Sequence, residues 1–289
     1  MSSMKDTNYN IDDIFAVIVL HKQSLDSSKT ILSLNESLKR NDSFLDVLVY
    51  DNSPQPQFSE SSFQLLNCRI NYMNDLSNPG VSKAYNVAAQ IAKKSNKSWL
   101  LLLDQDTEFP ENTIQTYLNA MNTHEDQDLF VPILLSSHGV FSPSKYYFKK
   151  GFLWLDVRPG VHSLKHRTVL NSGTLVSTNA FIDVGGYNEK IRLYFSDFNF
   201  IDKLRKKVRG FVVIDLVCKH QLSDQVNINL DDAKIRFNQY CEGSFQSAES
   251  ISGYLSYFAT VFLRSVLLSF RYSTPIFIKI FIIKYFRLK

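Results

Sequence analysis

Two aspartates one residue apart, Asp104 and Asp106, follow directly after the apolar run Leu100–Leu103. Side chains two residues apart in an extended segment lie on the same face of it. Two carboxylates placed in this way can share a divalent cation, and Mg²⁺ and Mn²⁺ are commonly bound by one or two carboxylates together with substrate phosphates. The pattern therefore predicts a metal–diphosphate site. A strand-end turn in which the aspartates only cap the backbone is the alternative.

A third acidic side chain, Asp51, also follows an apolar run. Strands are expected at residues 14–20, 44–53, 69–74 and 99–106, a helix at residues 24–40, and a turn followed by a helix within residues 77–96. Continuous apolar strands that alternate with helices are typical of an α/β fold with a mostly parallel sheet covered on both faces. Because such sheets bind ligands beyond the carboxyl ends of their strands, we expect Asp51 and Asp104 to face one crevice.

The second half of the chain is less regular. Residues 111–167 indicate a helix, a strand at 129–134 and a long loop region, and the run 210–220 indicates a final strand. From residue 226 onward the pattern becomes helical and strongly apolar. We therefore expect a catalytic domain over residues 1–225 and a helical, membrane-associating segment over residues 226–289.

Composition narrows the function classes. The chain has 289 residues, 44% hydrophobic residues and a net charge of +4, which describes a globular protein whose charge is too small to indicate nucleic-acid binding. Its 3 cysteines have no metal-binding spacing, so we expect reduced thiols in a cytosolic compartment. The first apolar run, Ile14–Leu20, is short and follows two aspartates, unlike a signal peptide.

Six short motifs occur in a fixed order: VLVYDNS, NPGVSKAYNVAAQIA, LLLLDQDT, NSGTLVS, GGYNEKIRLYFSDFNF and VCKH. In this order the chain resembles glycosyltransferase family 2 over roughly residues 14–225, and most closely its bacterial rhamnosyltransferase-like members, whose metal motif often reads Asp-Gln-Asp. The resemblance implies a nucleotide-binding fold of the glycosyltransferase A type. It also implies a nucleoside-diphosphate sugar donor, a divalent metal (Mg²⁺ or Mn²⁺) and inversion at the anomeric carbon.

The resemblance further implies roles for individual residues. On the donor side, the nucleotide sugar would be bound by Asp51, Asn52, Gly80, Asn86, Asp104, Ser172 and Gly173. Asp51 would contact the base or ribose, and the segment 171–173 would approach the sugar or the acceptor. The metal ligands would be Asp104, Asp106 and His220.

The catalytic base implied by the resemblance is Asp197. Many relatives carry a second acid two residues later, whereas this chain has Asn199, which can hydrogen-bond a sugar hydroxyl but cannot act as a base. Asp202 would be the important acid instead if the helix were displaced by a turn.

The expected function is transfer of a sugar, L-rhamnose from dTDP-rhamnose, to a lipid-linked saccharide in bacterial surface polysaccharide (O-antigen or capsule) assembly. Two alternatives remain open at this point. A hydrophobic strand followed by Asp-x-Asp also occurs in haloacid-dehalogenase-like phosphatases, although here Glu108 replaces their threonine and three strands precede the motif. A catalytically inactive scaffold with a glycosyltransferase fold is the other.

Two apolar stretches, residues 251–270 and 276–288, flank Pro275 near the end of the chain. The first approaches the length needed to span a bilayer, but Arg264 lies well inside it. We expect the two stretches to form helices that associate peripherally with the cytoplasmic face of the bacterial inner membrane. Packing of both helices on the catalytic core, or a membrane span, are the alternatives.

Overall fold

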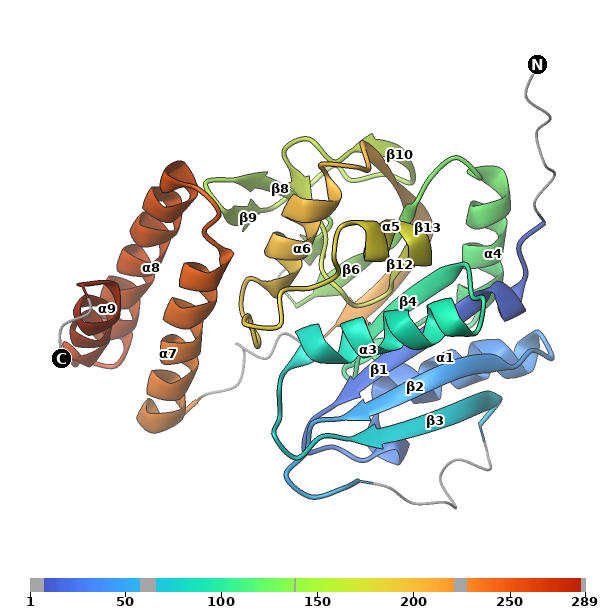
Figure 1. Cartoon of the computed structure of the whole chain (residues 1–289), viewed down its shortest axis with the longest axis horizontal. Helices are drawn as coiled ribbons and strands as arrows, with labels where there is room; N and C mark the ends of the chain where they lie inside the picture. The colour runs from blue at the N-terminus through green and yellow to red at the C-terminus, as the bar shows by residue number, and fades with distance from the viewer. Residues whose placement is uncertain (1–7, 58–65, 138, 221–227, 287–289) are drawn as a thin grey trace.

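A computed structural model describes residues 8–57, 66–137, 139–220 and 228–286 of the chain (Figure 1). One large sheet has the strand order β10-β13-β6-β12-β4-β1-β2-β3, with β5 pairing with β13 and β7 with β6. Its strands are β1 Ile14–Leu20, β2 Leu45–Asp51, β3 Cys68–Asn74, β4 Trp99–Asp104, β5 Thr107–Glu108, β6 Leu129–Ser136, β7 Gly139–Ser142, β10 Gly160–Ser163, β12 Thr174–Ser177 and β13 Gly210–His220.

The helices flank this sheet and then continue beyond it. They are α1 Lys29–Arg40, α3 Val81–Lys94, α4 Thr113–Thr123, α5 Thr178–Asp183, α6 Ser196–Leu204, α7 Leu230–Ser247, α8 Ile251–Arg271 and α9 Ile276–Phe286. The predicted first helix begins at Lys29 and not at residue 24, because residues 25–27 form a 3₁₀ turn and the Ser28 side chain caps the backbone of Ile31.

The predicted α/β class with a mostly parallel sheet is confirmed, since β4, β1, β2 and β3 run parallel and β13 is parallel to β6. One strand was not predicted. The segment β12 inserts antiparallel between β4 and β6. The expected loop region also contains short strands, because β8 Ser144–Tyr147, β9 Lys150–Phe152 and β11 Arg167–Thr168 form a small second sheet.

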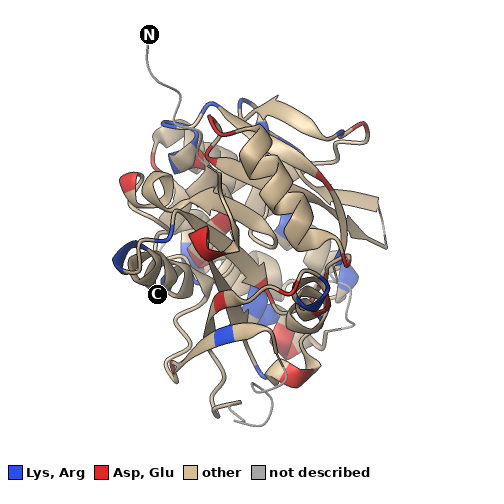
Figure 2. Ribbon diagram, turned by 90° about the vertical axis from the view of Figure 1, so that its right-hand side faces the viewer, with Lys and Arg blue, Asp and Glu red and all other residues tan. Residues whose placement is uncertain are grey.

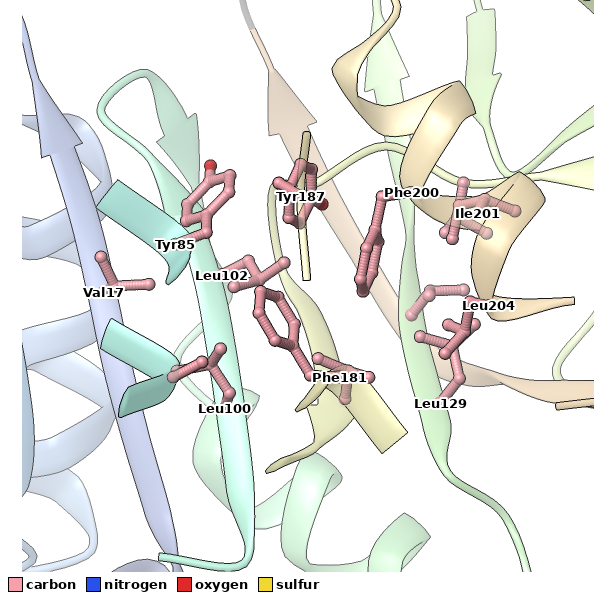
Figure 3. Close-up of a cluster of buried hydrophobic side chains, with 14 of the residues drawn as sticks. Val17, Tyr85, Leu100, Leu102, Leu129, Phe181, Tyr187, Phe200, Ile201 and Leu204 are labelled. Carbon is pink, nitrogen blue, oxygen red and sulfur yellow. The ribbon is translucent and has the colours of Figure 1, made fainter. Parts of the chain in front are cut away.

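Alternate side chains of β4 enter two hydrophobic layers, one on each face of the sheet. Leu100 and Leu102 belong to one cluster with residues of α3, α5 and α6, part of which Figure 3 shows, whereas Leu101 and Leu103 belong to the cluster on the α1 and α4 side. This explains the uninterrupted leucine run, since a strand buried on both faces needs apolar side chains at every position. The carboxyl end of β4 is thereby held rigidly between two layers.

The last three helices form a third hydrophobic cluster of their own at one end of the molecule (Figure 1). Aromatic residues of α9 (Phe277, Phe281 and Tyr285) are buried against α7 and α8. The break before α9 lies at Pro275, as predicted. The expected domain boundary at 225/226 lies outside the described residues, but α7 packs directly against α6. In the view of Figure 2, acidic and basic residues are interspersed along the ribbon.

Candidate functional site

A cleft of about 690 Å³ opens beyond the carboxyl ends of the central strands. Its walls come from the ends of β1, β2, β4 and β13, the start of α3, the first turn of α6 and one face of α7. The predicted residues that line it are Asn52, Gly80, Asp104, Asp106, Asp197 and His220. Residues separated by more than 160 positions are therefore brought together at the edge of the sheet, as the parallel topology predicts.

Asp104, the last residue of β4, and Asp106, just beyond it, differ in whether their carboxylate oxygens have hydrogen-bond partners. The Tyr85 hydroxyl donates to Oδ1 of Asp104 at 2.9 Å. Oδ1 of Asp106 is buried without a hydrogen-bond partner, and burial raises the pKa of Asp106 to about 6, with His220 opposing and Asp104 adding to the rise. An unsatisfied buried carboxylate oxygen beside a second carboxylate is stabilised by a cation. These two residues therefore fit the predicted divalent metal.

His220 is the third predicted metal ligand, and it lies beside Asp106. Pairing of β13 with β5 places its ring next to Thr107, whose Oγ1 is 2.7 Å from Nδ1, and this nitrogen is 3.5 Å from Oδ1 of Asp106. Within the described residues, no three His, Cys, Asp or Glu side chains are arranged so that they could hold a metal ion by themselves. The metal would therefore depend on the two carboxylates and on oxygens of the diphosphate, and the role of His220 stays a prediction.

Asp197, the predicted base, lies in the first turn of α6 and faces the same cleft. Burial raises its pKa to about 7, and the neighbouring Asp104 charge adds to this, while hydrogen bonds from Ser196 and Asn171 act in the opposite direction. A general base works best when its pKa lies near the operating pH. The environment of Asp197 therefore suits proton abstraction at neutral pH.

The rival acid, Asp202, is engaged elsewhere. Its carboxylate forms ion pairs with Lys149 at 2.5 Å and with Arg205 at 3.5 Å, and it does not line the cleft. Asn199 is buried, and its Oδ1 lacks a hydrogen-bond partner. The geometry therefore favours Asp197 over Asp202.

Asp51, the last residue of β2, and Asn52, which follows it, have different positions. Asp51 is fully buried, and its carboxylate accepts hydrogen bonds from the backbone of Ser53 and Gln57 at 2.8 Å and from the Tyr72 hydroxyl at 2.6 Å. Burial opposes ionisation, but these hydrogen bonds hold its pKa below the usual value. Asp51 orders the loop at the edge of the cleft and does not line it. Asn52 does line it, and its buried Oδ1 has no partner.

The segment 171–173 approaches the cleft only through Asn171. Ser172 lies behind the two aspartates Asp104 and Asp106, and its Oγ is 2.5 Å from Oγ1 of Thr107. The structure does not support a sugar-facing role for Gly173. Its φ is +77°, and a Cβ there would meet the ring of Pro132. Glycine is thus required at this position by the turn into β12 and by packing.

Two further predicted donor-binding residues, Gly80 just before α3 and Asn86 within α3, are also separated. Gly80 lines the cleft and has φ +88°, and a Cβ on it would collide with the backbone carbonyl of Arg192. Asn86 lies outside the cleft. Its side chain holds the loop after α5 through hydrogen bonds to the backbone of Tyr187 and to Glu189. The expectation that Asn86 lines the donor pocket is therefore not met by this geometry.

Sequence reasoning missed one whole wall of the cleft, which α7 supplies through Asp232, Ile235, Arg236 and Gln239. No motif marks these residues. It also missed Tyr85, which is fully buried next to Asp104, although its place in α3 directly before Asn86 gave a signal. Residues adjacent in a helix point about 100° apart, so Tyr85 and Asn86 point in different directions, and only Tyr85 reaches Asp104.

Comparison with known proteins agrees with the fold. A solved structure of GalNAc-T7 with UDP, GalNAc and Mn²⁺ superimposes with a TM-score of 0.55 at 14% identity, over 72% of this chain and 43% of that one. This similarity confirms the glycosyltransferase A type of fold, and the chain spans less than half of the length of that protein. No curated protein matches the chain at a significant level.

The family model described as glycosyl transferase family 2 matches residues 16–183, which is more than half of the chain. The matched segment contains most of β1, all of β2, β3 and β4, Asp104 and Asp106, and the segment 171–173. The position of Asp104 on β4, in the middle of the sheet and not on a first strand, also disagrees with the phosphatase alternative. The chain belongs to glycosyl transferase family 2.

Proposed function

We propose that the protein transfers a sugar from a nucleoside-diphosphate sugar to a saccharide hydroxyl, with inversion at the anomeric carbon. The observation that carries this proposal is that Asp197 and the Asp104–Asp106 pair line one cleft. Asp197 removes the proton from the acceptor hydroxyl as its oxygen attacks the anomeric carbon. A divalent cation bound by Asp104 and Asp106 would stabilise charge on the departing nucleoside diphosphate.

The side chains around this cleft position the two reacting groups. Tyr85 donates a hydrogen bond to Asp104 and leaves the other carboxylate oxygen available to a cation. The Tyr187 hydroxyl donates to Oδ1 of Asn171 at 2.5 Å, which turns the amide nitrogen of Asn171 toward a partner such as Asp197. Asn52, with its unsatisfied Oδ1, is suited to accept a hydrogen bond from the base or ribose.

For the donor we propose L-rhamnose from dTDP-rhamnose, supported by the Asp104-Gln105-Asp106 motif and its resemblance to rhamnosyltransferase-like relatives. UDP-N-acetylgalactosamine is the alternative to test beside it, because the GalNAc-T7 structure contains UDP and GalNAc. The inactive-scaffold alternative predicts no turnover of any donor.

For the acceptor we propose a lipid-linked saccharide at the cytoplasmic face of the bacterial inner membrane, in surface polysaccharide assembly. Among the described residues, α8 is the one helix long and apolar enough to cross a membrane, and only 22% of its apolar stretch is buried. Its exposed side carries Leu255, Phe262, Leu263, Leu267 and Phe270. We name these five residues the apolar face of α8.

Contacts on the opposite side of α8 support the proposal that this helix lies on the membrane and does not cross it. Arg264 is turned inward, with its guanidinium 4.5 Å from the ring centre of Tyr240. Arg264 is therefore removed from the lipid-facing side, where a charge would be costly. A helix with one packed side and one exposed apolar side is suited to the interface of a bilayer.

The experiment is a donor panel with purified protein, Mn²⁺ and a short saccharide acceptor. We expect nucleoside diphosphate release and a glycosylated product from one donor only, with the anomeric configuration opposite to that of the donor by NMR. The Asp197→Asn variant is the control. Turnover of several donors with retained configuration, or product formation by Asp197→Asn at the wild-type rate, would contradict the proposal.

A further inference from the structure

A second cavity, of about 290 Å³, lies between α7 and α8 and contains three arginines: Arg236, Arg264 and Arg271. The rest of its lining is apolar or aromatic, and no acidic side chain among the described residues lines it. We name it the arginine cavity. Guanidinium groups bind phosphate oxygens in pairs of parallel hydrogen bonds, so several of them in one cavity favour a ligand with one or more phosphate groups.

The arginine cavity adjoins the catalytic cleft. Arg236 and Ile228 line both of them. The two hollows therefore meet at Arg236 and Ile228. The cavity is thus placed to hold one part of a substrate whose other part reacts in the cleft.

The other side of the arginine cavity meets the apolar face of α8. Leu267 belongs to both, and it is 61% exposed. One helical turn further, Phe270 is 79% exposed. A hydrocarbon chain that leaves the cavity beside Leu267 would therefore continue along exposed apolar side chains, which lowers its contact with water.

Aromatic rings hold two of the three guanidinium groups. Arg264 lies over Tyr240 at 4.5 Å and near Tyr194 at 5.8 Å, and Arg271 lies 5.8 Å from the ring centre of Tyr272. A guanidinium that stacks on a ring keeps its N–H groups at the edge, where they can donate to an anion. Arg264, which lies closest to a ring, is in this way oriented before a ligand binds.

We propose that the arginine cavity binds the diphosphate of a lipid-diphosphate-linked acceptor, with the lipid leaving along the apolar face of α8 and the saccharide entering the cleft past Arg236. This inference rests on the proposed function, because it assigns the class of acceptor. It also predicts a short acceptor, since the cavity and the cleft share a wall and the reacting hydroxyl must lie close to the diphosphate.

The test uses farnesyl diphosphate as the probe and full-length protein in mild detergent. EDTA is present so that Asp104 and Asp106 bind no divalent cation. Calorimetry should show binding to the wild type, at least about tenfold weaker binding of inorganic pyrophosphate, and no binding of farnesol. Arg271→Ala and Arg264→Lys should each weaken farnesyl diphosphate binding by about tenfold, the loss expected for a charge-assisted hydrogen bond. Lys279→Ala, on the exposed side of α9, is the matched control and should stay within twofold.

Each other outcome would overturn the assignment. Equal binding of pyrophosphate and farnesyl diphosphate would mean that the lipid plays no part. Equal losses in Arg271→Ala and Lys279→Ala, matched by equal losses of binding to phosphatidylglycerol vesicles, would mean general attraction to anionic lipid. Wild-type binding by both arginine variants would exclude the cavity. Arg271 is exposed at the end of α8, so its replacement tests the cavity even if Arg264→Lys disturbs the fold.

Metal-dependent hydrolysis of the donor tests the proposed function of the cleft independently of ligand binding in the arginine cavity. Both arginine variants should hydrolyse the donor at the wild-type rate, because neither residue lines the cleft. Loss of farnesyl diphosphate binding with normal donor hydrolysis supports the inference. No donor hydrolysis in any protein, including the wild type, would refute the proposed function and leave the binding result to decide the cavity.

Discussion

Replacement of Asp197 by asparagine should remove transfer activity and also stabilise the metal-free fold at neutral and alkaline pH. In the folded chain, burial and the Asp104 charge raise the pKa of Asp197 from 3.8 to about 7. Above pH 7 the folded protein therefore contains a buried charge that the unfolded chain keeps in water. Asparagine has nearly the same shape and carries no charge, so the variant avoids this cost at every pH.

The pH dependence of the stability follows from the direction of the pKa shift. Below pH 4 the Asp197 carboxyl is protonated in both the folded and the unfolded state, so it does not change the free energy of unfolding. Between pH 4 and 7 the unfolded chain loses its proton first, so wild-type stability falls as the pH rises. Above pH 7 the Asp197 carboxyl is ionised in both states, and its destabilisation of the folded state reaches its full value. A shift of about three pKa units corresponds to about 4 kcal/mol. Altered hydrogen bonds to Ser196 and Asn171 reduce the net gain by about 1 kcal/mol.

Thermal unfolding of wild type and variant in EDTA at pH 5 and pH 8 measures this effect. A gain of about 3 kcal/mol corresponds to a rise of roughly 5–10 °C in the unfolding midpoint at pH 8, and the rise should be smaller at pH 5. Transfer measured with saturating donor should fall by at least about a hundredfold, while metal-dependent donor binding should be unchanged.

Asp202→Asn is the matched control, since it makes the same chemical change five residues further along. The Asp202 carboxylate pairs with Lys149 and Arg205, so its loss should destabilise the fold by about 1–3 kcal/mol without affecting transfer. An equal change in midpoint at pH 5 and pH 8 for Asp197→Asn would refute the buried-charge reasoning. Loss of transfer in Asp202→Asn alone would show that the base has been misassigned.

Three further predictions concern the Asp104–Asp106 pair, the orientation of Asn171 and membrane binding by α8. Asp106→Ala should abolish Mn²⁺-dependent nucleotide binding in calorimetry, and normal Mn²⁺-dependent affinity would contradict its role. Tyr187→Phe should lower kcat about tenfold with an unchanged KM for the donor, since it removes the hydrogen bond that orients Asn171. The control is Tyr117→Phe, which removes a buried hydrogen bond outside the cleft and should leave kcat unchanged. Leu263→Glu should weaken vesicle binding by at least about tenfold in flotation assays, from the loss of about 1.5–3 kcal/mol of apolar burial, whereas Leu32→Glu on α1 should not.

The sheet and the placement of Asp104 and Asp106 at the end of a central strand could be predicted because they depend on local patterns. An apolar run that ends in Asp104 indicates a buried strand and a carboxylate at its end without any knowledge of the neighbouring strands. The same holds for Asp51 after β2, yet its contacts could not be foreseen. The carboxylate is satisfied by Ser53, Gln57 and Tyr72, and the last of these lies on the neighbouring strand β3. A motif gives the place of a side chain in a strand but not which groups compete for its oxygens.

Gly173 and Asn86 show the limit of motif-based inference more sharply. Gly173 was expected to lie in a segment that approaches the sugar or the acceptor, but β12 runs antiparallel between β4 and β6, and Pro132 of β6 occupies the space beside it. Nothing in the local sequence indicates that insertion. For Asn86 the helical period did contain the answer, because Tyr85 points to Asp104 and its neighbour must point elsewhere.

The contribution of α7 could not be predicted, because it depends on contacts between segments far apart in the chain. Gly243 of α7 allows close approach to the backbone of Tyr194, where a Cβ would collide, and Phe195 packs on Tyr240 at 4.5 Å. Tyr194 and Phe195 directly precede the helix that carries Asp197. The base is therefore fixed against the helix that lines both the cleft and the arginine cavity, and that helix shares a hydrophobic cluster with α8. Because α8 would rest on the bilayer by its apolar face, the height of Asp197 above the lipid is set by packing between helices and not by a loop. A base held at a fixed height favours acceptors whose reacting hydroxyl lies at one short distance from the membrane, which is the selectivity expected for an enzyme that adds one sugar to one lipid-linked intermediate.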